Sequence, residues 1–395
     1  MKSEWSVSTL EDVCTVITDG AHNSPKSVED GMYMASVKDF TEYGFNFNSC
    51  RQISTEDYQK LEKQGCVPQL DDVLVGKDGA RYFEDIIIYR QDEKPALLSS
   101  IAILRANPNI ITPEFLYYTL KTPEVKKNVR DNYGSGSAIP RIVLKDFKRM
   151  PFSFPSLDVQ TRITSIFCSI DETIKNNMEI NENLLQQALC LFEEEFITKA
   201  DIGEKLPLYE FADYINGAAF KPDELGDAGL PVIKIAELKA GITGSTRFFS
   251  GDKGTKYLVH NKDILFSWSG NPETSIDLFI WSEGDGVLNQ HTFNVKSKYS
   301  CPWFTFLMLK YHKPAFTHIA SNKQTTGLGH VTAADLKRLT FPFDLDRMKA
   351  FEAIVAPIMD LLYNNLLVNR ELSSLRDTLL PKMMSGELDV SEFDL

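Results

Sequence analysis

The chain has 395 residues, enough for two domains with hydrophobic cores, and its 43% hydrophobic content excludes general disorder. Its apolar runs span only a few residues and Met1–Trp5 lacks an apolar core, so we expect neither a membrane span nor a signal peptide. The net charge of −13 argues against a protein that is basic over its whole surface.

The first half of the chain opens with short strand-like runs separated by turn residues. We expect strands at 31–37, 72–75, 85–89 and 99–104. A helix is expected at 113–120, because proline and glutamate stand in its first turn. The turn-rich segment 133–140 and the aromatic segment 152–155 then lead into a long helix that begins near Asp158. Mixed short strands and helices predict an α+β (mixed α/β) domain.

The second half repeats this order. The run 166–170 with Asn176, Asn177 and Asn181 recurs 188 residues later as 354–358 with Asn364, Asn365 and Asn369. A period this long lies outside those of solenoids and propellers, so each copy is a domain-sized unit. The predicted fold is two similar globular domains, each followed by a long helix, with pseudo-two-fold symmetry. The expected boundaries are 1–155 for the first domain, 156–204 for its helix and linker, 205–344 for the second domain, 345–388 for its helix and 389–395 for an acidic tail.

Both predicted long helices carry apolar residues at alternating spacings of four and three, which is the heptad pattern of paired helices. We predict an antiparallel coiled coil, the alternative being two core helices buried in separate domains. Asn177 and Asn365 occupy equivalent positions and are predicted to meet near the crossing, although solvent-facing asparagines are the simpler alternative. The expected pairing residues are Ile166, Ile170, Asn177, Ile180 and Leu184 in the first helix, and Ile358, Leu361, Asn365, Val368 and Leu372 in the second.

Two basic stretches stand at equivalent places in the copies, at 121–150 and 296–338, while acidic residues concentrate in the first long helix and the tail. Polar and basic loops with nearby aromatic residues suit contacts to phosphates and base edges, although loops are usually polar. The candidates for DNA contact are Lys77, Arg81, Tyr82, Tyr133, Ser135, Arg141 and Lys145 in the first copy, and Trp268, Asn271, Asn289, Gln290, Lys323, Gln324, Thr326 and His330 in the second.

Motifs for catalysis and metal binding are largely lacking. The chain has no phosphate-binding loop, no nucleophile elbow and no Pro-Pro dipeptide of the kind found in DNA methyltransferase motifs. The six cysteines and six histidines are scattered, which predicts reduced thiols in the cytoplasm and no metal site. One weak match remains, because Asp223 followed by Glu237 and Lys239 fits a loose pattern of Mg-dependent nucleases. The corresponding stretch of the first copy lacks it.

In the order and duplication of these elements, the chain resembles the specificity (S) subunit of type I restriction–modification systems, the HsdS family, over nearly its whole length. The resemblance is carried by Asp72–Val75 with Gly79, by Asp263–Phe266 with Gly270, by the repeated asparagine-bearing helices and by the closing run 379–388. The aromatic entries at Phe152 and Phe341 add to it.

The resemblance implies a non-catalytic subunit with two target-recognition domains, each of which binds one half of a bipartite double-stranded DNA sequence. The paired helices would dock two methyltransferase (M) subunits and set the spacer, and restriction (R) subunits would join through the complex. No cofactor is expected in this chain, since S-adenosylmethionine, ATP and Mg would belong to the partner subunits. A stand-alone Mg-dependent nuclease and a coiled-coil scaffold that does not recognise DNA are the alternatives.

Overall fold

The computed structural model describes residues 5–79, 81–133, 140–199, 203–324, 328–388 and 390. The chain divides into two compact units, unit 1 made of Met1–Lys175 with Ser373–Leu395 and unit 2 made of Asn176–Leu372. Each unit therefore contains one globular domain and a section of each long helix. The units are described separately below.

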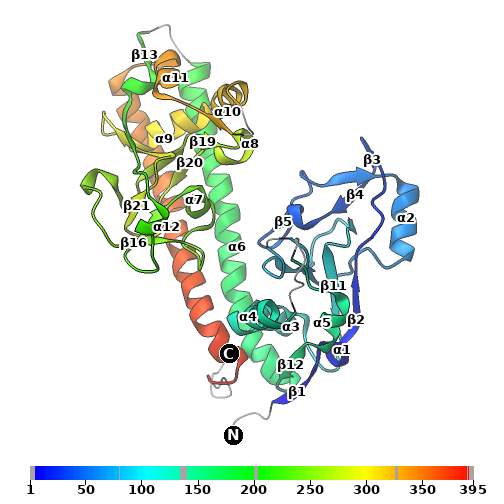
Figure 1. Ribbon diagram of the computed structural model, residues 1–395. Coiled ribbons are helices and arrows are strands. Elements are labelled where there is room, and N and C mark those ends of the chain that lie inside the picture. The colour runs from blue at the N-terminus through cyan, green and yellow to red at the C-terminus, as the bar shows by residue number, and fades with distance from the viewer. Residues whose placement is uncertain are drawn as a thin grey trace. The chain divides into compact units, whose positions relative to one another are not determined.

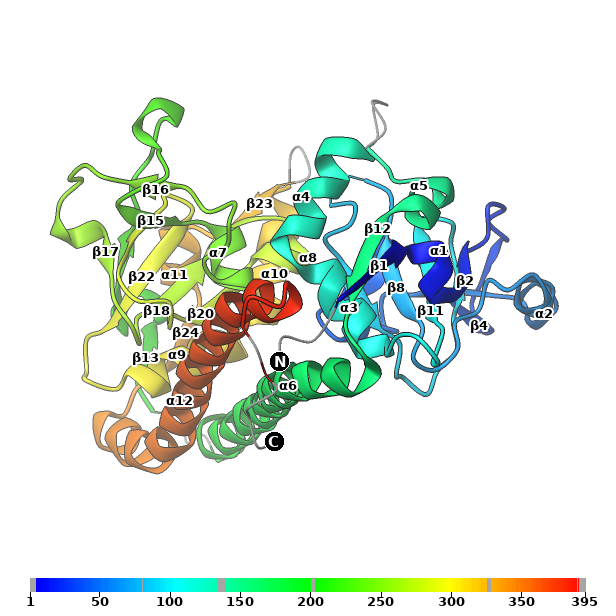
Figure 2. The same ribbon diagram turned by 90° about the horizontal axis from the view of Figure 1, so that it is seen from below.

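Unit 1 is built around an antiparallel sheet with the strand order β2-β11-β8-β9, and a second sheet has the order β10-β4-β7-β3. Figure 2 shows α1 and α5 beside β2 of the first sheet. The strands of unit 1 are β1 (Ser6–Thr9), β2 (Cys14–Asp19), β3 (Ser27–Val28), β4 (Met32–Ala35), β5 (Phe40–Thr41), β6 (Gly44–Phe45), β7 (Arg51–Ile53), β8 (Val73–Gly76), β9 (Ile86–Ile88), β10 (Ala96–Leu97), β11 (Ile101–Ala106) and β12 (Pro151–Phe154). Its helices are α1 (Leu10–Val13), α2 (Thr55–Lys63), α3 (Pro113–Lys121), α4 (Pro123–Asn132), α5 (Leu144–Arg149) and the beginning of α6 (Leu157–Glu193).

Unit 2 repeats the topology of the main sheet, whereas its second sheet shares three strands with that of unit 1 and has its fourth strand, β17, beside β21 at the opposite edge from β3. Its main sheet has the order β14-β22-β18-β20, and its second sheet has the order β16-β15-β21-β17. The strands of unit 2 are β13 (Lys205–Pro207), β14 (Ala212–Asn216), β15 (Leu230–Ile233), β16 (Phe248–Phe249), β17 (Leu258–Val259), β18 (Ile264–Ser267), β19 (Ser269–Gly270), β20 (Asp277–Ile280), β21 (Gly286–Leu288), β22 (Thr292–Ser297), β23 (Gly329–His330) and β24 (Thr340–Pro342). Its helices are α7 (Ile235–Ala240), α8 (Pro272–Ser275), α9 (Pro302–Tyr311), α10 (Lys313–Asn322), α11 (Ala333–Arg338) and most of α12 (Leu345–Met384). The predicted mixed α+β class with duplicated domains is confirmed.

The repeated element, Asp-Val-Leu-Val at 72–75 and Asp-Ile-Leu-Phe at 263–266, has the same structural role in both units. In unit 1, Asp72 is buried and accepts two hydrogen bonds from Arg105 of the neighbouring strand at 2.7 and 2.8 Å. In unit 2, Asp263 accepts hydrogen bonds from Lys296 and Asn294 of β22 at 2.5 and 2.9 Å. Each carboxylate thus joins the start of a central strand to the next strand, and the motif stabilises the sheet.

The long helices contact each other and run antiparallel (Figure 1). Within unit 2, Asn177 donates to Asn369 at 2.8 Å, and Asn365 donates to Asn181 at 2.9 Å. Farther along the same pair, Arg347 donates to Glu195 at 2.8 Å. The two asparagine hydrogen bonds join positions that the repeat makes equivalent, as a local two-fold relation between the helices requires.

Helix α12 is long and apolar enough, by length and composition, to cross a membrane, with a mean hydropathy of 1.3 in its most apolar window. Part of this stretch packs inside the protein, because Val355, Met359 and Leu362 belong to the core of unit 2, and 28% of the window is buried. The side chains of Asn365 and Asn369 of α12 also form hydrogen bonds with α6. Packing within the fold therefore explains one part of the apolar composition of α12.

Candidate functional site

Unit 1 brings together two of the loops that the sequence singles out. The loop that follows β8 lies beside the segment before α5, because the Gly79 amide donates to the Pro140 carbonyl at 3.0 Å. The Ile142 amide donates to the Lys77 carbonyl, also at 3.0 Å, and the backbones of Asp78 and Arg141 form an antiparallel β-bridge. We call this arrangement the loop junction of unit 1, residues 77–79, 81–82 and 140–142.

Unit 2 contains the same junction, made of residues 268–271 and 329–331. Here Ser269 pairs with His330 and Gly270 with Gly329, and the Val331 amide donates to the Trp268 carbonyl at 2.8 Å. Gly79 and Gly270 hold the same place in the two junctions, with φ of +96° and +134°. Because residues with a side chain rarely adopt positive φ values of this kind, the backbone conformation favours glycine at both positions.

The side chains at the centre of the unit 1 junction form a buried ion pair. Lys77 is 7% exposed, and its Nζ lies 3.2 Å from a carboxylate oxygen of Asp19 and 3.8 Å from one of Asp78. Asp19 is 8% exposed and also lies 3.2 Å from Nε2 of His22. Lys77, expected from the sequence to contact DNA, is thus engaged inside the protein, because two carboxylates neutralise its ammonium there.

The corresponding place in unit 2 is aromatic. Trp268 donates its indole N–H to the side-chain oxygen of Asn216 at 3.1 Å and stacks on Phe293, with ring centroids 5.6 Å apart. The ring of His291 lies 5.9 Å from that of Trp268. Trp268 and Asn216 thus occupy the positions that Lys77 and Asp19 occupy in unit 1.

The other DNA-contact candidates of unit 1 differ in how they are engaged. Arg81 is exposed and forms an ion pair with Asp85 at 2.7 Å. Tyr82 and Tyr133 are half-buried against the core, with Arg149 over the Tyr133 ring. Arg141 and Lys145 are exposed, and neither forms an ion pair among the described residues. Ser135 lies outside the described residues.

The candidates of unit 2 are also divided between structural and accessible positions. Asn271 is exposed and caps α8 by accepting from the amides of Glu273 and Thr274 at 3.0 and 3.2 Å. Asn289 is 7% exposed and donates to Gln290 at 2.8 Å. Lys323 forms an ion pair with the buried Asp335, Gln324 is exposed and His330 half-buried. Thr326 lies outside the described residues.

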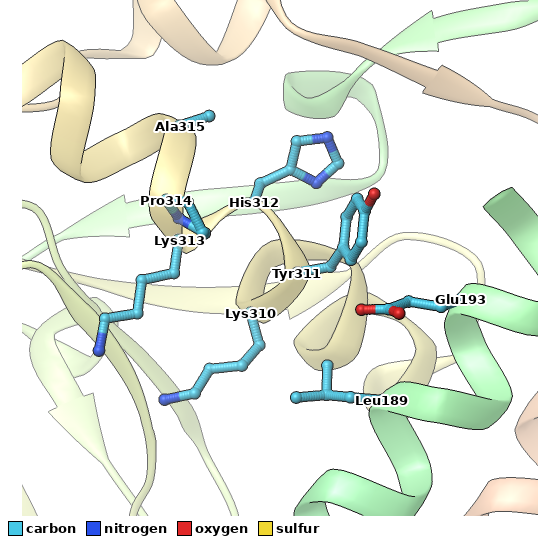
Figure 3. A pocket seen from close by; sticks show the side chains of 8 residues that line it. All are labelled: Leu189, Glu193, Lys310, Tyr311, His312, Lys313, Pro314 and Ala315. Carbon is cyan, nitrogen blue, oxygen red and sulfur yellow. The ribbon is translucent and has the colours of Figure 1, made fainter.

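Much of the basic stretch of unit 2 is neutralised by acidic partners. Lys310 and Lys313 bond to Asp277 at 2.6 and 2.5 Å beside an open cavity of ≈ 530 Å³, where their side chains extend in the same direction (Figure 3). Although burial opposes it, the two ammonium groups hold the pKa of Asp277 below its ordinary value. Asp335 likewise has a lowered pKa, because bonds from Lys323 and Thr332 outweigh the effect of burial. A run of basic residues in the sequence is therefore not by itself a cationic surface.

The expected helix-pairing residues fall into two groups. Ile170 is buried, and Ile166, Leu184 and Ile358 pack against the cores of their units, while Leu372 is half-buried. Asn177 and Asn365 are hydrogen-bonded across the pair, but to Asn369 and Asn181 rather than to each other. Ile180, Leu361 and Val368 depart from expectation, since they are 44%, 48% and 43% exposed.

The inward face of α12 is displaced by one residue from the predicted seam. Val355, Met359 and Leu362 are buried in the core of unit 2, because the domain as well as α6 packs on that face. The predicted positions Leu361 and Val368, together with Ile354, instead form an exposed apolar stripe with heptad spacing. Leu375, seven residues farther along the chain, is also exposed.

The weak nuclease pattern has a structural explanation. Glu237 is buried, and its carboxylate accepts the amide hydrogen of Lys234 at the start of α7. In unit 1, Asp39 performs the same capping by accepting from the amide and hydroxyl of Ser36 at 2.9 Å. Within the part of the chain that the structure describes, no group of three or more His, Cys, Asp or Glu is placed to hold a metal ion.

Three residues beside the junctions were not among the sequence candidates: Asp19 contacts Lys77, His22 contacts Asp19, and Asn216 accepts from Trp268. A signal for them exists, because the string Asp19-Gly-Ala of unit 1 recurs as Asn216-Gly-Ala in unit 2. The glycine is required at both places. A Cβ at Gly20 would lie 2.2 Å from the Leu97 carbonyl oxygen, and one at Gly217 would lie 2.1 Å from that of Asn289.

The chain is similar to known specificity proteins of type I restriction systems. A family model described as "Type I restriction modification DNA specificity domain" matches residues 2–186 and 204–344. The chain is 24% identical over 314 residues to the type I restriction enzyme MjaIX specificity subunit of Methanocaldococcus jannaschii, covering 71% of this chain and 70% of the relative. It is 29% identical over 98 residues to the type I restriction enzyme HindI specificity subunit of Haemophilus influenzae, covering 24% and 21%.

A solved structure shares the fold. The crystal structure of a type I restriction–modification system S subunit from M. genitalium superimposes with a TM-score of 0.51 at 15% sequence identity. The likeness covers 97% of this chain and 96% of that one. The arrangement of two sheet domains with two long contacting helices is therefore shared at the level of the fold.

Proposed function

Because the chain belongs to the family of type I restriction–modification DNA specificity proteins, we propose that each unit recognises one half of a bipartite DNA sequence and that the paired helices dock M subunits. In this role the chain is the non-catalytic specificity subunit of the restriction enzyme. Methylation and cleavage, with S-adenosylmethionine, ATP and Mg, belong to M and R subunits. The complex would act on DNA in the cytoplasm.

The observation that carries the DNA proposal is the duplicated loop junction. Both units join the loop after the central strand to the segment before the next short helix, with glycine at the same point. The side chains at its centre nevertheless differ, with Lys77 and Asp19 in unit 1 and Trp268 and Asn216 in unit 2. A constant backbone with different side chains is what two related readers of different half-sites need.

Arg141 and Lys145 are the strongest candidates for phosphate contact in unit 1, because both are exposed without an ion pair among the described residues. Phosphate contacts orient a protein on the duplex, whereas base-edge contacts supply its specificity. In unit 2, Trp268 and His330 of the junction, and Gln290 beside His291, whose carbonyl accepts from the Trp268 amide, carry groups that can contact bases or sugars. Two half-sites recognised from one face of DNA would lie about one helical turn apart. We propose that the helix pair sets this distance.

The exposed stripe Ile354, Leu361 and Val368 supports the proposal that α12 contributes to M-subunit docking. These side chains repeat every seven residues on one face of the helix, while the neighbouring face is buried in the domain core. Heptad-spaced apolar residues suit packing by another helix. We therefore assign the stripe to a helical surface of the M subunit.

A domain exchange tests the recognition proposal. Residues 1–150 would be replaced by the corresponding domain of another specificity subunit, and methylated motifs would be mapped in cells that express the chimera with the M subunit. We expect one half of the target sequence to change and the other half to remain. A change in both halves would refute the modular assignment.

A single charge tests the docking proposal. Leu361→Asp places a carboxylate on the exposed stripe, so we expect the chain to fold normally and to lose most of its association with the M subunit in size-exclusion chromatography. Asn322→Asp is the control, because it adds the same charge at an exposed position on a different helix of unit 2, α10. Full assembly of Leu361→Asp would exclude this face as the dock.

Two other functions give different results in simple experiments. A scaffold that does not recognise a DNA sequence would bind duplexes of random sequence and duplexes that contain the mapped target motif with equal affinity and equal salt dependence. A stand-alone nuclease would cut DNA with Mg alone and lose that activity in Glu237→Gln. The capping role of Glu237 instead leads us to expect that the purified chain does not cut DNA.

A further inference from the structure

One exposed imidazole stands at the end of a buried ion pair in unit 1. The side chain of His22 is 74% exposed, and its Nε2 lies 3.2 Å from Asp19. Asp19 is in turn held at 3.2 Å by Lys77, and both of these charged residues are at most 8% exposed. Burying two charges is costly, and here the pair also fixes the orientation of a ring that faces solvent.

The backbone before His22 is fixed on both sides. The Gly20 amide donates to Ile101 at 3.1 Å, and the Ala21 amide donates to Leu97 at 2.7 Å. The Ala21 carbonyl accepts from the Ser99 amide at 3.0 Å. The close approach of Gly20 to the Leu97 carbonyl leaves no space for a side chain. His22 therefore projects from a rigid part of the domain, beside the loop junction.

The ion pair also determines which nitrogen of the ring is available. An ionised carboxylate only accepts hydrogen bonds, so Nε2 carries the hydrogen that points to Asp19. In the neutral ring Nδ1 is then an acceptor. In the major groove, an acceptor of this kind is complementary to the exocyclic amino group of adenine or cytosine.

We propose that His22 is a specificity-determining residue of unit 1, which accepts a hydrogen bond at Nδ1 from the amino group of one adenine or cytosine in the half-site. Asp19 and Lys77 are its positioning residues. This inference rests on the proposed function, because it requires that the loop junction of unit 1 faces DNA.

Unit 2 supplies an internal comparison. The position equivalent to His22 is Ala219, and the ion pair is replaced by the hydrogen bond of Trp268 to Asn216. Neither the imidazole nor its charged support is present at that place in unit 2. The effect of His22 is therefore confined to one half of the target.

The test uses the complex of this chain with its M subunit, after the wild-type target has been mapped from methylated DNA. Binding is measured by competition with duplexes in which each base pair of the target is replaced in turn. We expect His22→Ala to lose discrimination at one base pair of the unit 1 half-site, on the order of tenfold to a hundredfold. Asp19→Asn should weaken discrimination at the same base pair, and Asn23→Ala, an exposed neighbour, should change nothing.

A base analogue isolates the contact. Replacing the amino-bearing base by an analogue without that amino group should weaken binding of the wild-type complex and have no further effect on His22→Ala. His22→Gln is the second variant and should also shift discrimination only at that position. An unchanged profile in both variants, or a uniform loss at all positions, would overturn the role of His22 while leaving the proposed function intact. A wild-type complex without any sequence preference would overturn both.

Discussion

One contact between the globular domain and the long helices is polar in unit 1, and the equivalent contact in unit 2 is apolar. In unit 1, Tyr118 of α3 donates to Asp171 of α6 at 2.7 Å, and Arg376 of α12 donates to the other oxygen of Asp171 at the same distance. The side chains of Asp171 and Arg376 are only 10% and 11% exposed. We call this set the polar joint.

The equivalent positions in unit 2 are Leu307 of α9, Met359 of α12 and Ala188 of α6, and all three are fully buried in its core. The repeat therefore preserves where a domain packs on the helix pair but not the chemistry of the contact. Close packing at this contact requires only that the side chains fill the available volume. Either a buried ion pair or apolar side chains can satisfy that requirement. The charged version adds direction, because an ion pair with hydrogen bonds permits few geometries.

The charges of the polar joint also affect their neighbours. Burial and the nearby Arg376 lower the pKa of Lys121, whose ammonium donates to the Tyr117 hydroxyl at 2.8 Å. Burial and the carboxylate of Asp171 raise the pKa of Tyr118, so its hydroxyl remains the donor. In unit 2, the equivalent Lys310 is instead neutralised by Asp277. The two joints thus differ over a wider set of residues than the three that make contact.

Breaking the polar joint should have the largest effect on stability. Arg376→Met leaves Asp171 buried without its cation, which typically costs about 3–5 kcal/mol. We expect unit 1 to unfold at lower urea, with a loss of hydrogen-exchange protection in α3. Lys382→Met, an exposed basic residue on the same helix, is the control and should have little effect. Unchanged protection of α3 in Arg376→Met would show that the ion pair contributes nothing.

Converting the polar joint into the apolar one sharpens the same comparison. The triple variant Tyr118→Leu, Asp171→Met and Arg376→Ala gives unit 1 the residues of unit 2 at these positions. Replacing a whole buried ion pair by hydrocarbon is often neutral or stabilising, so we expect urea stability within about 2 kcal/mol of the wild type. A triple variant as unstable as Arg376→Met would mean that the surrounding cavity fits only the polar residues.

The architecture could be predicted from the sequence because the repeat identifies equivalent elements in the two halves. Equivalent segments such as 72–75 and 263–266 became equivalent strands, and the helices predicted near Asp158 and after Phe343 span Leu157–Glu193 and Leu345–Met384. The inward face of α12 was not predictable in the same way. That helix has apolar residues on two adjacent faces, and only the fold shows that Val355 packs inward while Ile354 is exposed.

The candidate site shows a similar division. Polarity identified the loops that the structure joins, but it could not distinguish the buried Lys77 from the exposed Arg141. That difference depends on Asp19, which lies far away in sequence and is brought close by the pairing of β2 with β11. His22 escaped notice because a lone histidine carries no pattern. Its importance follows only from its contact with Asp19.

The helix crossing contrasts with the joints, because there the repeat conserves chemistry as well as place. Asn365 donates to the 9%-exposed Asn181, in the same way as Asn177 donates to Asn369. Asn365→Ala removes the donor and leaves the buried Asn181 oxygen without that bond, a change that costs about 1–3 kcal/mol. Asn364→Ala, its exposed neighbour, is the matched control. Equal urea midpoints for the two variants would show that the crossing bond does not stabilise the pair.

Acid should distinguish the units by a smaller amount. Burial lowers the pKa of His312, which begins the turn into α10 and lies in the cavity wall of Figure 3, below its ordinary value of 6.5. The folded protein then binds a proton less readily than the unfolded chain. The titration of His312 therefore does not reduce the free energy of unfolding above pH 6.5. As the pH falls from there toward the folded-state pKa, the free energy of unfolding decreases by at most about 1.4 kcal/mol per pH unit.

Unit 1 has Pro123 at the equivalent position, so this source of acid sensitivity belongs to unit 2. His312→Asn keeps a donor for the Met308 carbonyl, which His312 contacts at 2.7 Å, and removes the titration. We expect it to flatten the dependence of the urea midpoint on pH between 5 and 6.5, as followed by fluorescence of the three tryptophans of unit 2. His318→Asn alters an exposed histidine on α10 and should leave the slope unchanged. If His312→Asn retains the wild-type slope, another group must titrate in that range, and the difference in acid sensitivity cannot be assigned to the His312 position.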